Sequence, residues 1–418
     1  MGDSSFWHPF AAMGAVRGAE FVLTRGEDVW VWDDAGTRYL DATASLWCVN
    51  VGHGRREIAD AVHAQMLELA TYQTFGDVTN EPVRALTDRL AALAPMPDTK
   101  IFLGSGGGDA IDTAAKIARE YFVRTGEPER TVLISRTNAY HGTHGFGTSL
   151  GGIPPNRLAA PFVPDVVQVA HDDADALDAE IRRIGPEKVA MFIAEPVIGA
   201  GGVIPPAPGY LERAAAVCAQ HGVMFVADSV ICGFGRLGSW FGVERFGLQP
   251  DMIVFAKGVT SGYVPLGGLV VSARVAAPFW EEPGTAAFRH GATYAGHPTA
   301  CAAALANLDI IDREDLLDRA VKLEDELHAA LGTLTDHPLV AEVRGGTGVL
   351  GAVELDPERL AADPSIVARV AMAARARGVL VRPMLSALAV SPPLTVQTEH
   401  LDLLVDAVRV GLDAAAAR

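Results

Sequence analysis

The sequence is poor in cysteine. Its 418 residues include only Cys48, Cys218, Cys232 and Cys301, which show none of the short spacings typical of a disulfide framework or a zinc site. We therefore expect no bound metal and a reducing, cytoplasmic location. The N-terminal segment lacks the basic start and apolar run of a signal peptide, and no apolar run reaches the length of a membrane-spanning helix.

Positive charge is also in short supply. Lys and Arg number 34 against 51 Asp and Glu, which gives a formal net charge of −17. This balance argues against nucleic acid and anionic membranes as partners, because both attract basic surfaces. It does not exclude small anionic ligands, since these respond to local backbone dipoles rather than to net charge.

The sequence shows no internal repeats or low-complexity linkers. Apolar residues make up 49% of it and charged residues 20%, so a sizeable core can be buried. From about residue 100, short apolar runs alternate with helical stretches, which indicates an α/β protein with a mostly parallel sheet flanked by helices. The expected strands are 101–103, 131–134, 189–194, 223–227, 252–256 and 269–272, and the expected helices include 109–123 and 210–220.

The two ends of the chain follow a different pattern. Residues 21–39 alternate apolar and polar as in a small β-meander, while 316–331 and 399–415 have helical periodicity, with strands expected near 349–355 and 379–382. We interpret both ends as one smaller α+β domain. The predicted bounds are 1–55 and 311–418 for the two parts of the small domain and 56–310 for the large domain.

Lys257 follows the apolar run 252–256 directly, and glycines come after it at positions 258, 262, 267 and 268. A lysine held at a strand end and partly removed from water has a lowered pKa, and its amine becomes a nucleophile that can form a Schiff base. Taken alone, the stretch is also compatible with a solvated lysine that ends a strand.

A glycine-rich turn, Ser105-Gly106-Gly107-Gly108, lies between an expected strand and an expected helix. Backbone N–H groups at a helix N-terminus favour an anion such as a phosphate. The turn is not a dinucleotide fingerprint, because Asp109 replaces the third glycine, and it is not a P-loop, because no Gly-Lys-Ser/Thr follows. A tight turn without a ligand remains an alternative.

Two further side chains follow expected strands. Tyr140 can lie flat on a planar ring, although a core or surface aromatic is the alternative. Asp228 comes directly after the strand 223–227 and can hold a protonated ring nitrogen by a charge-assisted hydrogen bond, unless it only forms a turn. Val230 faces the same side and can cover the ring opposite Tyr140.

Four features thus follow strands of one parallel sheet, at the edge where ligands bind. They are a phosphate site, an aromatic side chain that can stack on a ring, a carboxylate and a lysine. The cofactor that needs all four is pyridoxal 5′-phosphate. The carboxylate keeps the pyridine nitrogen protonated. The lysine binds the cofactor and then moves a proton between the substrate Cα and C4′.

Seven motifs carry a family resemblance that runs nearly end to end. They are LWCVNVGHG at 46–54, DTAAK at 112–116, YHGT at 140–143, AEPVIG at 194–199, D-x-V-x-x-GFGR at 228–236, AKG at 256–258 and HGAT at 290–293. Together they resemble the class III (omega) aminotransferases, pyridoxal phosphate enzymes of fold type I. They are more similar to the amine– and β-alanine–pyruvate branch than to the ornithine branch.

The resemblance implies roles for individual residues. Lys257 matches the Schiff-base lysine, Asp228 the pyridinium partner and Tyr140 the residue that stacks on the ring. The cofactor-binding residues that it implies are Gly107, Gly108, Tyr140, His141, Glu195, Asp228, Val230, Lys257 and Thr293.

The same resemblance extends to the substrate and the partner subunit. Thr293 matches a threonine that reaches the phosphate of the neighbouring subunit, which implies a homodimer with shared active sites. Trp47 matches an aromatic wall of the substrate pocket. Arg382 matches a mobile arginine that grips a substrate carboxylate, a role that suits a planar bidentate cation, although a structural ion pair is the alternative.

The sequence also departs from the family pattern. Ser229 stands where glutamate is usual, and Ser105 where asparagine is usual. In the family, the glycine-rich turn that binds the phosphate usually ends in serine or threonine, whereas Gly108 offers only its backbone N–H. These changes bear on cofactor affinity and substrate scope rather than on the lysine chemistry.

The prediction is pyridoxal phosphate-dependent transamination by a ping-pong mechanism through a Lys257 Schiff base. An amino group moves from a primary amine or amino acid to a keto acid or aldehyde such as pyruvate. Two alternatives stay open at this point: another pyridoxal phosphate reaction on the same scaffold (a decarboxylase, racemase or aminomutase), and a non-catalytic cofactor-binding protein.

Overall fold

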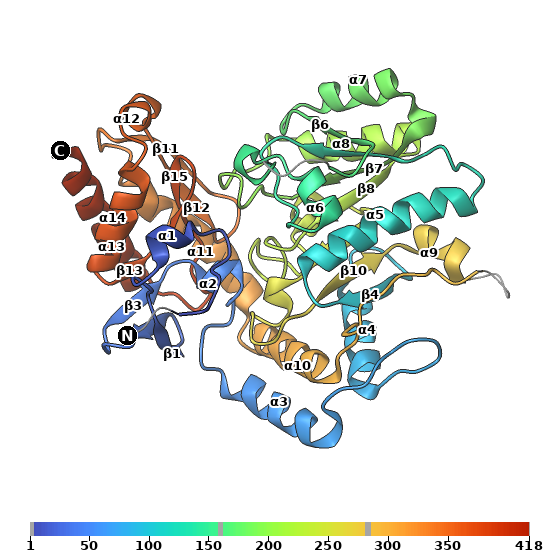
Figure 1. Cartoon of the computed structure of the whole chain (residues 1–418), viewed down its shortest axis with the longest axis horizontal. Coiled ribbons are helices and arrows are strands. Elements are labelled where there is room, and N and C mark those ends of the chain that lie inside the picture. The colour runs from blue at the N-terminus through green and yellow to red at the C-terminus, as the bar shows by residue number, and fades with distance from the viewer. Residues whose placement is uncertain (1–3, 158–161, 281–285, 418) are drawn as a thin grey trace.

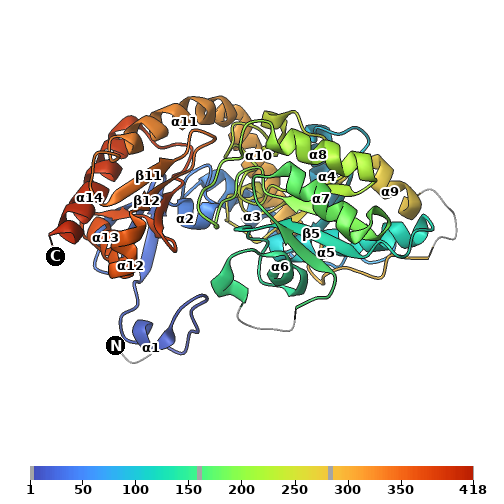
Figure 2. The same ribbon diagram turned by 90° about the horizontal axis from the view of Figure 1, so that it is seen from above.

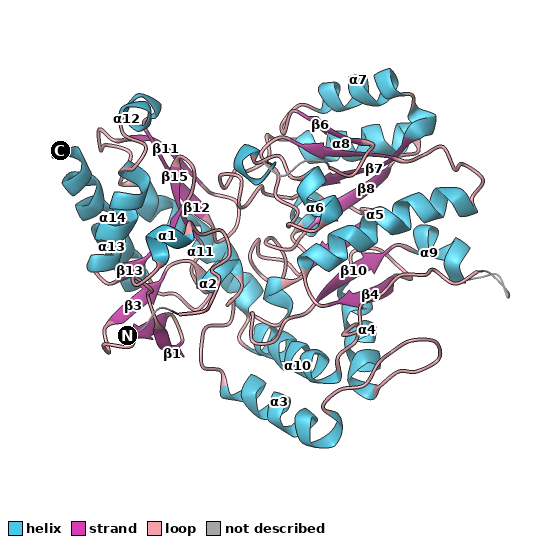
Figure 3. Cartoon of the chain, in the orientation of Figure 1, coloured by secondary structure: helices cyan, strands magenta, loops and turns pink. Residues whose placement is uncertain are grey.

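The computed structural model describes residues 4–157, 162–280 and 286–417, which form two lobes side by side (Figures 1 and 3). The larger lobe holds a seven-stranded sheet with the strand order β4-β10-β9-β8-β7-β5-β6. Its strands are β4 (Lys100–Gly104), β5 (Val132–Arg136), β6 (Val166–Val169), β7 (Val189–Ala194), β8 (Met224–Asp228), β9 (Met252–Phe255) and β10 (Gly267–Val271). Only β10 runs antiparallel to its neighbours, so the expected α/β fold with a mostly parallel sheet is confirmed.

Both faces of this sheet are buried. Met224 and Val226 of β8 belong to the apolar cluster that includes α5 (Gly107–Arg124), whereas Phe225 and Ala227 belong to the cluster that includes α7 (Ala174–Ile184) and α8 (Tyr210–His221). Successive residues of a strand point to opposite faces, which is why these strands are apolar throughout instead of alternating.

Three helices pack together beside the β4 edge (Figure 1). They are α3 (Arg56–Leu69), α4 (Glu81–Leu93) and α10 (Pro298–Arg313). The shorter helices of the chain are α1 (Met13–Val16), α2 (Ala44–Trp47), α6 (Gly145–Leu150), α9 (Ala273–Trp280) and α12 (Pro357–Ala362). The segment that carries α1 extends away from the rest of the second lobe (Figure 2).

The second lobe contains two four-stranded sheets. One is β1 (Leu23–Glu27), β2 (Trp30–Asp33), β3 (Arg38–Asp41) and β13 (Val379–Leu380); the other is β11 (Val340–Arg344), β12 (Gly351–Leu355), β15 (Ala387–Val390) and β14 (Arg382–Pro383). The parallel pairing of β3 with β13 joins the two ends of the chain in one sheet. The helices α11 (Leu316–Gly332), α13 (Ile366–Ala376) and α14 (Thr398–Ala416) complete this lobe. The domain bounds 1–55, 56–310 and 311–418 stay a prediction.

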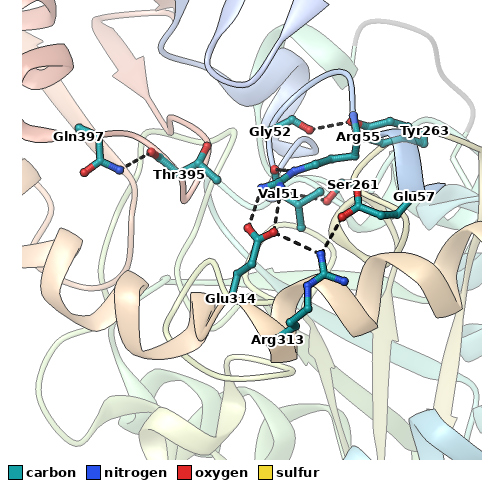
Figure 4. A network of polar contacts seen from close by, with 10 residues as sticks. All are labelled: Val51, Gly52, Arg55, Glu57, Ser261, Tyr263, Arg313, Glu314, Thr395 and Gln397. Carbon is teal, nitrogen blue, oxygen red and sulfur yellow. Dashed lines mark hydrogen bonds and ion pairs between the residues drawn. The ribbon is translucent and has the colours of Figure 1, made fainter. Parts of the chain in front are cut away.

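A polar network ties together the two places where the chain passes between the lobes (Figure 4). The guanidinium of Arg55 donates to both carboxylate oxygens of Glu314, at 2.8 and 2.7 Å. The Tyr263 hydroxyl accepts the backbone N–H of Arg55 at 2.7 Å and donates to the carbonyl of Gly52 at 2.8 Å. Arg313 contacts both Glu57 and Glu314.

Two expected elements need correction. The helix expected over 109–123 begins earlier, at Gly107, because first-turn N–H groups need no partner within the helix, so the glycines cost little there. The strand expected over 379–382 is two strands, since β13 pairs in one sheet and β14 in the other, with Val381 between them. None of the helices within the described residues combines the length and apolarity that a bilayer crossing needs.

Candidate active site

A cavity of about 170 Å³ lies where β8 and β9 end beside the start of α5. It gathers eight of the eleven predicted site residues: Gly107, Gly108, Tyr140, His141, Glu195, Asp228, Val230 and Lys257. Ile111, Gly142, Ile231 and Ala256 also line it, and sequence reasoning missed these four. Ile111 and Ala256 were within reach of that reasoning, because Ile111 lies one helical turn after Gly107 and Ala256 directly precedes Lys257.

Asp228 owes its position to the alternation of β8. Met224, Val226 and Asp228 share the face that packs on α5, so the carboxylate comes to the α5 side as the strand ends. Asp228 is 3% exposed, and its Oδ1 accepts the backbone N–H of Val230 at 3.1 Å. Its Oδ2 lies 2.7 Å from Nδ1 of the buried His141.

Lys257 lies in the turn that follows β9, so it does not continue the alternation of the strand. Its φ of +45° lies in the left-handed region, which is unusual for a residue with a side chain and marks a constrained turn. Burial lowers the pKa of the Lys257 amine, and the nearby acidic side chains Asp228 and Glu195 oppose the shift. A lowered pKa raises the fraction of neutral, nucleophilic amine.

The glycine-rich turn becomes the first turn of α5. A Cβ at Gly107 would lie 3.1 Å from Val230 Cγ2, so glycine lets Val230 pack directly on the turn. The N–H groups of the first helical turn have no acceptor within the helix, and two of the residues that carry them, Gly107 and Gly108, line the cavity. Within this region, Oδ2 of Asp109 accepts the backbone N–H of Ser105 at 2.9 Å.

Glu195 and Tyr140 are connected through the backbone. The Glu195 carboxylate accepts the N–H of Tyr140 at 3.1 Å and of Gly199 at 2.9 Å. Burial raises the pKa of Glu195, and Asp228 adds to the rise, while His141 and the two N–H groups oppose it. Burial also raises the pKa of the Tyr140 hydroxyl, against the nearby positive charge of Arg382.

The three remaining predicted residues lie outside the cavity lining. Arg382, in β14, is partly buried, and burial lowers its pKa. Within the described ranges it makes no ion pair, so the alternative of a structural ion pair has no support there. Trp47 is 3% exposed and belongs to the same apolar cluster as the cavity residue Ile231, while Thr293 lies exposed in the loop before α10.

The serine at position 229 is fully buried, and its hydroxyl has no hydrogen-bond partner among the described residues. It therefore brings no charge to the strand end where the family usually has glutamate. Cys232 is likewise buried, and its thiol lies 3.4 Å from the carbonyl of Val197.

Comparison with known proteins decides the family. The profile of the aminotransferase class-III family matches residues 13–410. The chain belongs to the class III aminotransferases. It is 38% identical over 420 residues to the putrescine–pyruvate aminotransferase of Pseudomonas aeruginosa, covering 95% of this chain and 91% of the relative. It is also 38% identical over 421 residues to the diaminobutyrate–2-oxoglutarate transaminase of Halomonas elongata, covering 92% of this chain and 88% of the relative.

Solved structures agree with this assignment. An (S)-enantioselective omega-transaminase from Thermomicrobium roseum superposes with a TM-score of 0.93 at 39% identity, over 98% of this chain and 96% of that one. An amine transaminase from an uncultivated Pseudomonas species, solved with pyridoxal phosphate bound, gives 0.92 at 38% identity over 99% of both chains. Fold type I is confirmed, and the aminotransferase is a pyridoxal phosphate-dependent transaminase.

The cavity suits this cofactor chemically. The N-terminus of α5 has the chemistry to bind a phosphate, the buried carboxylate of Asp228 would suit a protonated ring nitrogen, and Lys257 would supply the amine. The buried Nε2 of His141 lacks a hydrogen-bond partner within the described part of the chain, which leaves polar capacity beside Asp228.

Proposed function

We propose that Lys257 holds the cofactor and moves protons, that Asp228 binds the ring nitrogen, and that Tyr140 and Val230 cover the two faces of the ring. Gly107 and Gly108 would bind the phosphate, with His141 and Glu195 as supporting residues. The observation that carries this assignment is the convergence of the α5 N-terminus, Asp228 and Lys257 on one small cavity. Each of the three supplies a different chemical requirement of the cofactor.

The bound cofactor supplies an electron sink for the bond that breaks at the substrate Cα. The chain itself supplies proton transfer and orientation. A partly buried Lys257 with a lowered pKa is neutral in a larger share of molecules than a free lysine, so it can accept the Cα proton. The carboxylate of Asp228 would keep the ring nitrogen of the cofactor protonated, and apolar walls such as Ile111 and Ile231 would limit the access of water.

We propose that the reaction runs in two halves, in which a primary amine or amino acid leaves its nitrogen on the enzyme and a keto acid removes it. Pyruvate is the acceptor that we favour, because the similar enzyme of P. aeruginosa is a putrescine–pyruvate aminotransferase. Arg382 is the group that would bind its carboxylate, since its positive charge lies close enough to act on the Tyr140 hydroxyl and it has no ion-pair partner in the described ranges.

We further propose a homodimer in which Thr293 reaches the phosphate site of the partner subunit. Thr293 is exposed and lies outside the cavity of its own chain. A groove of about 700 Å³ is lined by Gly291 and Ala295, on either side of Thr293 in the sequence, and by the exposed Phe75. Tyr294, next to Thr293, is also exposed, and exposed apolar surfaces of this kind mark interaction sites. The cytoplasmic location stays a prediction.

The test is an absorbance spectrum of the protein loaded with pyridoxal phosphate, recorded before and after addition of an amine donor and then of pyruvate. We expect a cofactor band that the donor removes and pyruvate restores, and that does not form in Lys257→Ala. A band that donors never alter would contradict transamination. A wild-type protein that forms no band at all would contradict the assignment of the site.

A further inference from the structure

Gly108 leaves a gap at the predicted phosphate site, and a histidine from another element fills it. A Cβ built on Gly108 would lie 3.1 Å from both Cε1 and Nδ1 of His144 and 3.2 Å from its Cδ2. The imidazole therefore occupies the space into which a serine or threonine side chain at this position would project. Contacts of that length are tighter than ordinary van der Waals packing, so a side chain at position 108 would have to displace the ring by a few tenths of an ångström.

The backbone that carries His144 is fixed close to the start of α5. Gly142, with φ of +87°, turns the chain so closely past α5 that a Cβ on it would lie 3.3 Å from the Cα of Gly108. His144 is the residue immediately before α6, and the carboxylate of Asp112 in α5 accepts the N–H of Phe146 at 3.1 Å. The start of α6 is thus attached to α5 one turn beyond the glycines.

The ring also has a charged neighbour. Nδ1 of His144 lies 3.5 Å from Asp109 Oδ1, and the His144 side chain is 52% exposed. Asp109 places a negative charge in the first turn of α5, beside the site where a phosphate would bind. A histidine next to it can offset this charge when protonated, and its second ring nitrogen, Nε2, remains available as a hydrogen-bond donor.

We propose that His144 replaces the missing hydroxyl of position 108 as a side-chain ligand of the cofactor phosphate. The inference rests on the proposed function, because it assumes that the phosphate lies at the N-terminus of α5. Gly108 and His144 act as a pair in this proposal: glycine leaves the space, and the imidazole enters it with a donor that the backbone N–H groups alone do not provide.

The test compares cofactor retention in four variants: His144→Ala, His144→Phe, Gly108→Ser and the double variant Gly108→Ser/His144→Ala. Each protein is loaded with pyridoxal phosphate, and the loss of the cofactor band is followed after dilution. The shift of the bound phosphate is recorded by ³¹P NMR. We expect His144→Ala and His144→Phe to weaken cofactor binding about tenfold, or about 1.4 kcal/mol, and to move the ³¹P signal.

The other two variants test the pairing. Gly108→Ser alone introduces a contact with His144 and should not strengthen binding, whereas in the double variant the serine should recover most of the lost affinity. Wild-type affinity in His144→Ala would overturn the proposal. So would wild-type affinity in His144→Phe, because it would show that the ring only fills space. These results apply only if the wild type forms its cofactor band; a wild type without the band would contradict the proposed function instead.

Discussion

The imidazole of His141 and the carboxylate of Asp228 form a buried pair, with Nδ1 and Oδ2 2.7 Å apart and both residues at most 3% exposed. A carboxylate accepts and does not donate, so Nδ1 carries the hydrogen in this contact. The hydrogen bond from His141 occupies Oδ2 of Asp228 and fixes the orientation of the carboxylate. It connects the YHGT motif to the strand end 87 residues later in the chain.

His141 should therefore act on the reaction as a positioning residue for Asp228. We expect His141→Ala to lower kcat/KM about 10- to 100-fold at saturating cofactor, which is the effect of one hydrogen bond to a charged group. Asp228→Ala should lower it more, by roughly a thousandfold or beyond, because the carboxylate itself is lost. Steady-state kinetics and the pH dependence of the cofactor band are the measurements.

Ser229→Ala is the control for this pair. The residue is adjacent to Asp228 and equally buried, but its hydroxyl has no partner within the described residues, so its removal should leave kcat/KM within about twofold. If His141→Ala behaves like Ser229→Ala, the pair has no role in the reaction.

Arg382 gives a prediction about the acceptor. Replacement by alanine should raise the KM for pyruvate about 10- to 100-fold, because a charge-assisted hydrogen bond to the substrate carboxylate is lost. The KM for an aldehyde acceptor without a carboxylate should stay within about twofold. The exposed Arg377 lies five residues earlier, and Arg377→Ala serves as the control for a general loss of positive charge. An equal loss with both acceptors would assign Arg382 a structural role.

Much of the sheet and most of the cavity could be predicted from the sequence, because both depend on local patterns. The runs that became β7, β8 and β9 are continuous and apolar, as strands buried on both faces must be. Asp228 and Lys257 end such runs, and topology alone brings such positions to one edge of a parallel sheet.

Contacts between distant segments were harder to predict. The ring of His144 lies over Gly108 only because Gly142 turns sharply and α6 packs on α5, and neither feature has a periodic signal. Strand β15 was missed for another reason, since a four-residue apolar run is compatible with several structures.

The Arg55–Glu314 ion pair should contribute to stability more than its surface neighbours do. Its side chains are 21% and 30% exposed, and it has bidentate geometry. Arg55→Ala should lower the free energy of unfolding by about 1–3 kcal/mol, measured as a lower urea midpoint at an unchanged slope.

Arg313→Ala is the matched comparison. Figure 4 shows that Arg313 contacts Glu57 and, at 3.4 Å, Glu314. Arg313 is 54% exposed and Glu57 is 48% exposed, so solvent screens their interaction. This variant should change the free energy of unfolding by no more than about 0.5 kcal/mol. An equal loss of unfolding free energy in the two variants would contradict a special role for the Arg55–Glu314 pair, which connects the two places where the chain passes between the lobes.

If each active site is shared between two subunits, mixing two defective variants should restore function, whereas self-contained subunits would stay defective. Lys257→Ala should be inactive, and Thr293→Ala should bind the cofactor less tightly and lose activity at low pyridoxal phosphate. In a heterodimer of the two variants, one site combines an intact Lys257 with an intact threonine from the other chain. Unfolding and refolding the two variants together should therefore restore high-affinity sites, about one per heterodimer.

Each variant refolded alone is the control, and sedimentation analysis establishes the oligomeric state. If mixing restores nothing while heterodimers demonstrably form, Thr293 acts within its own subunit or not at all, and the proposed sharing of the site is wrong.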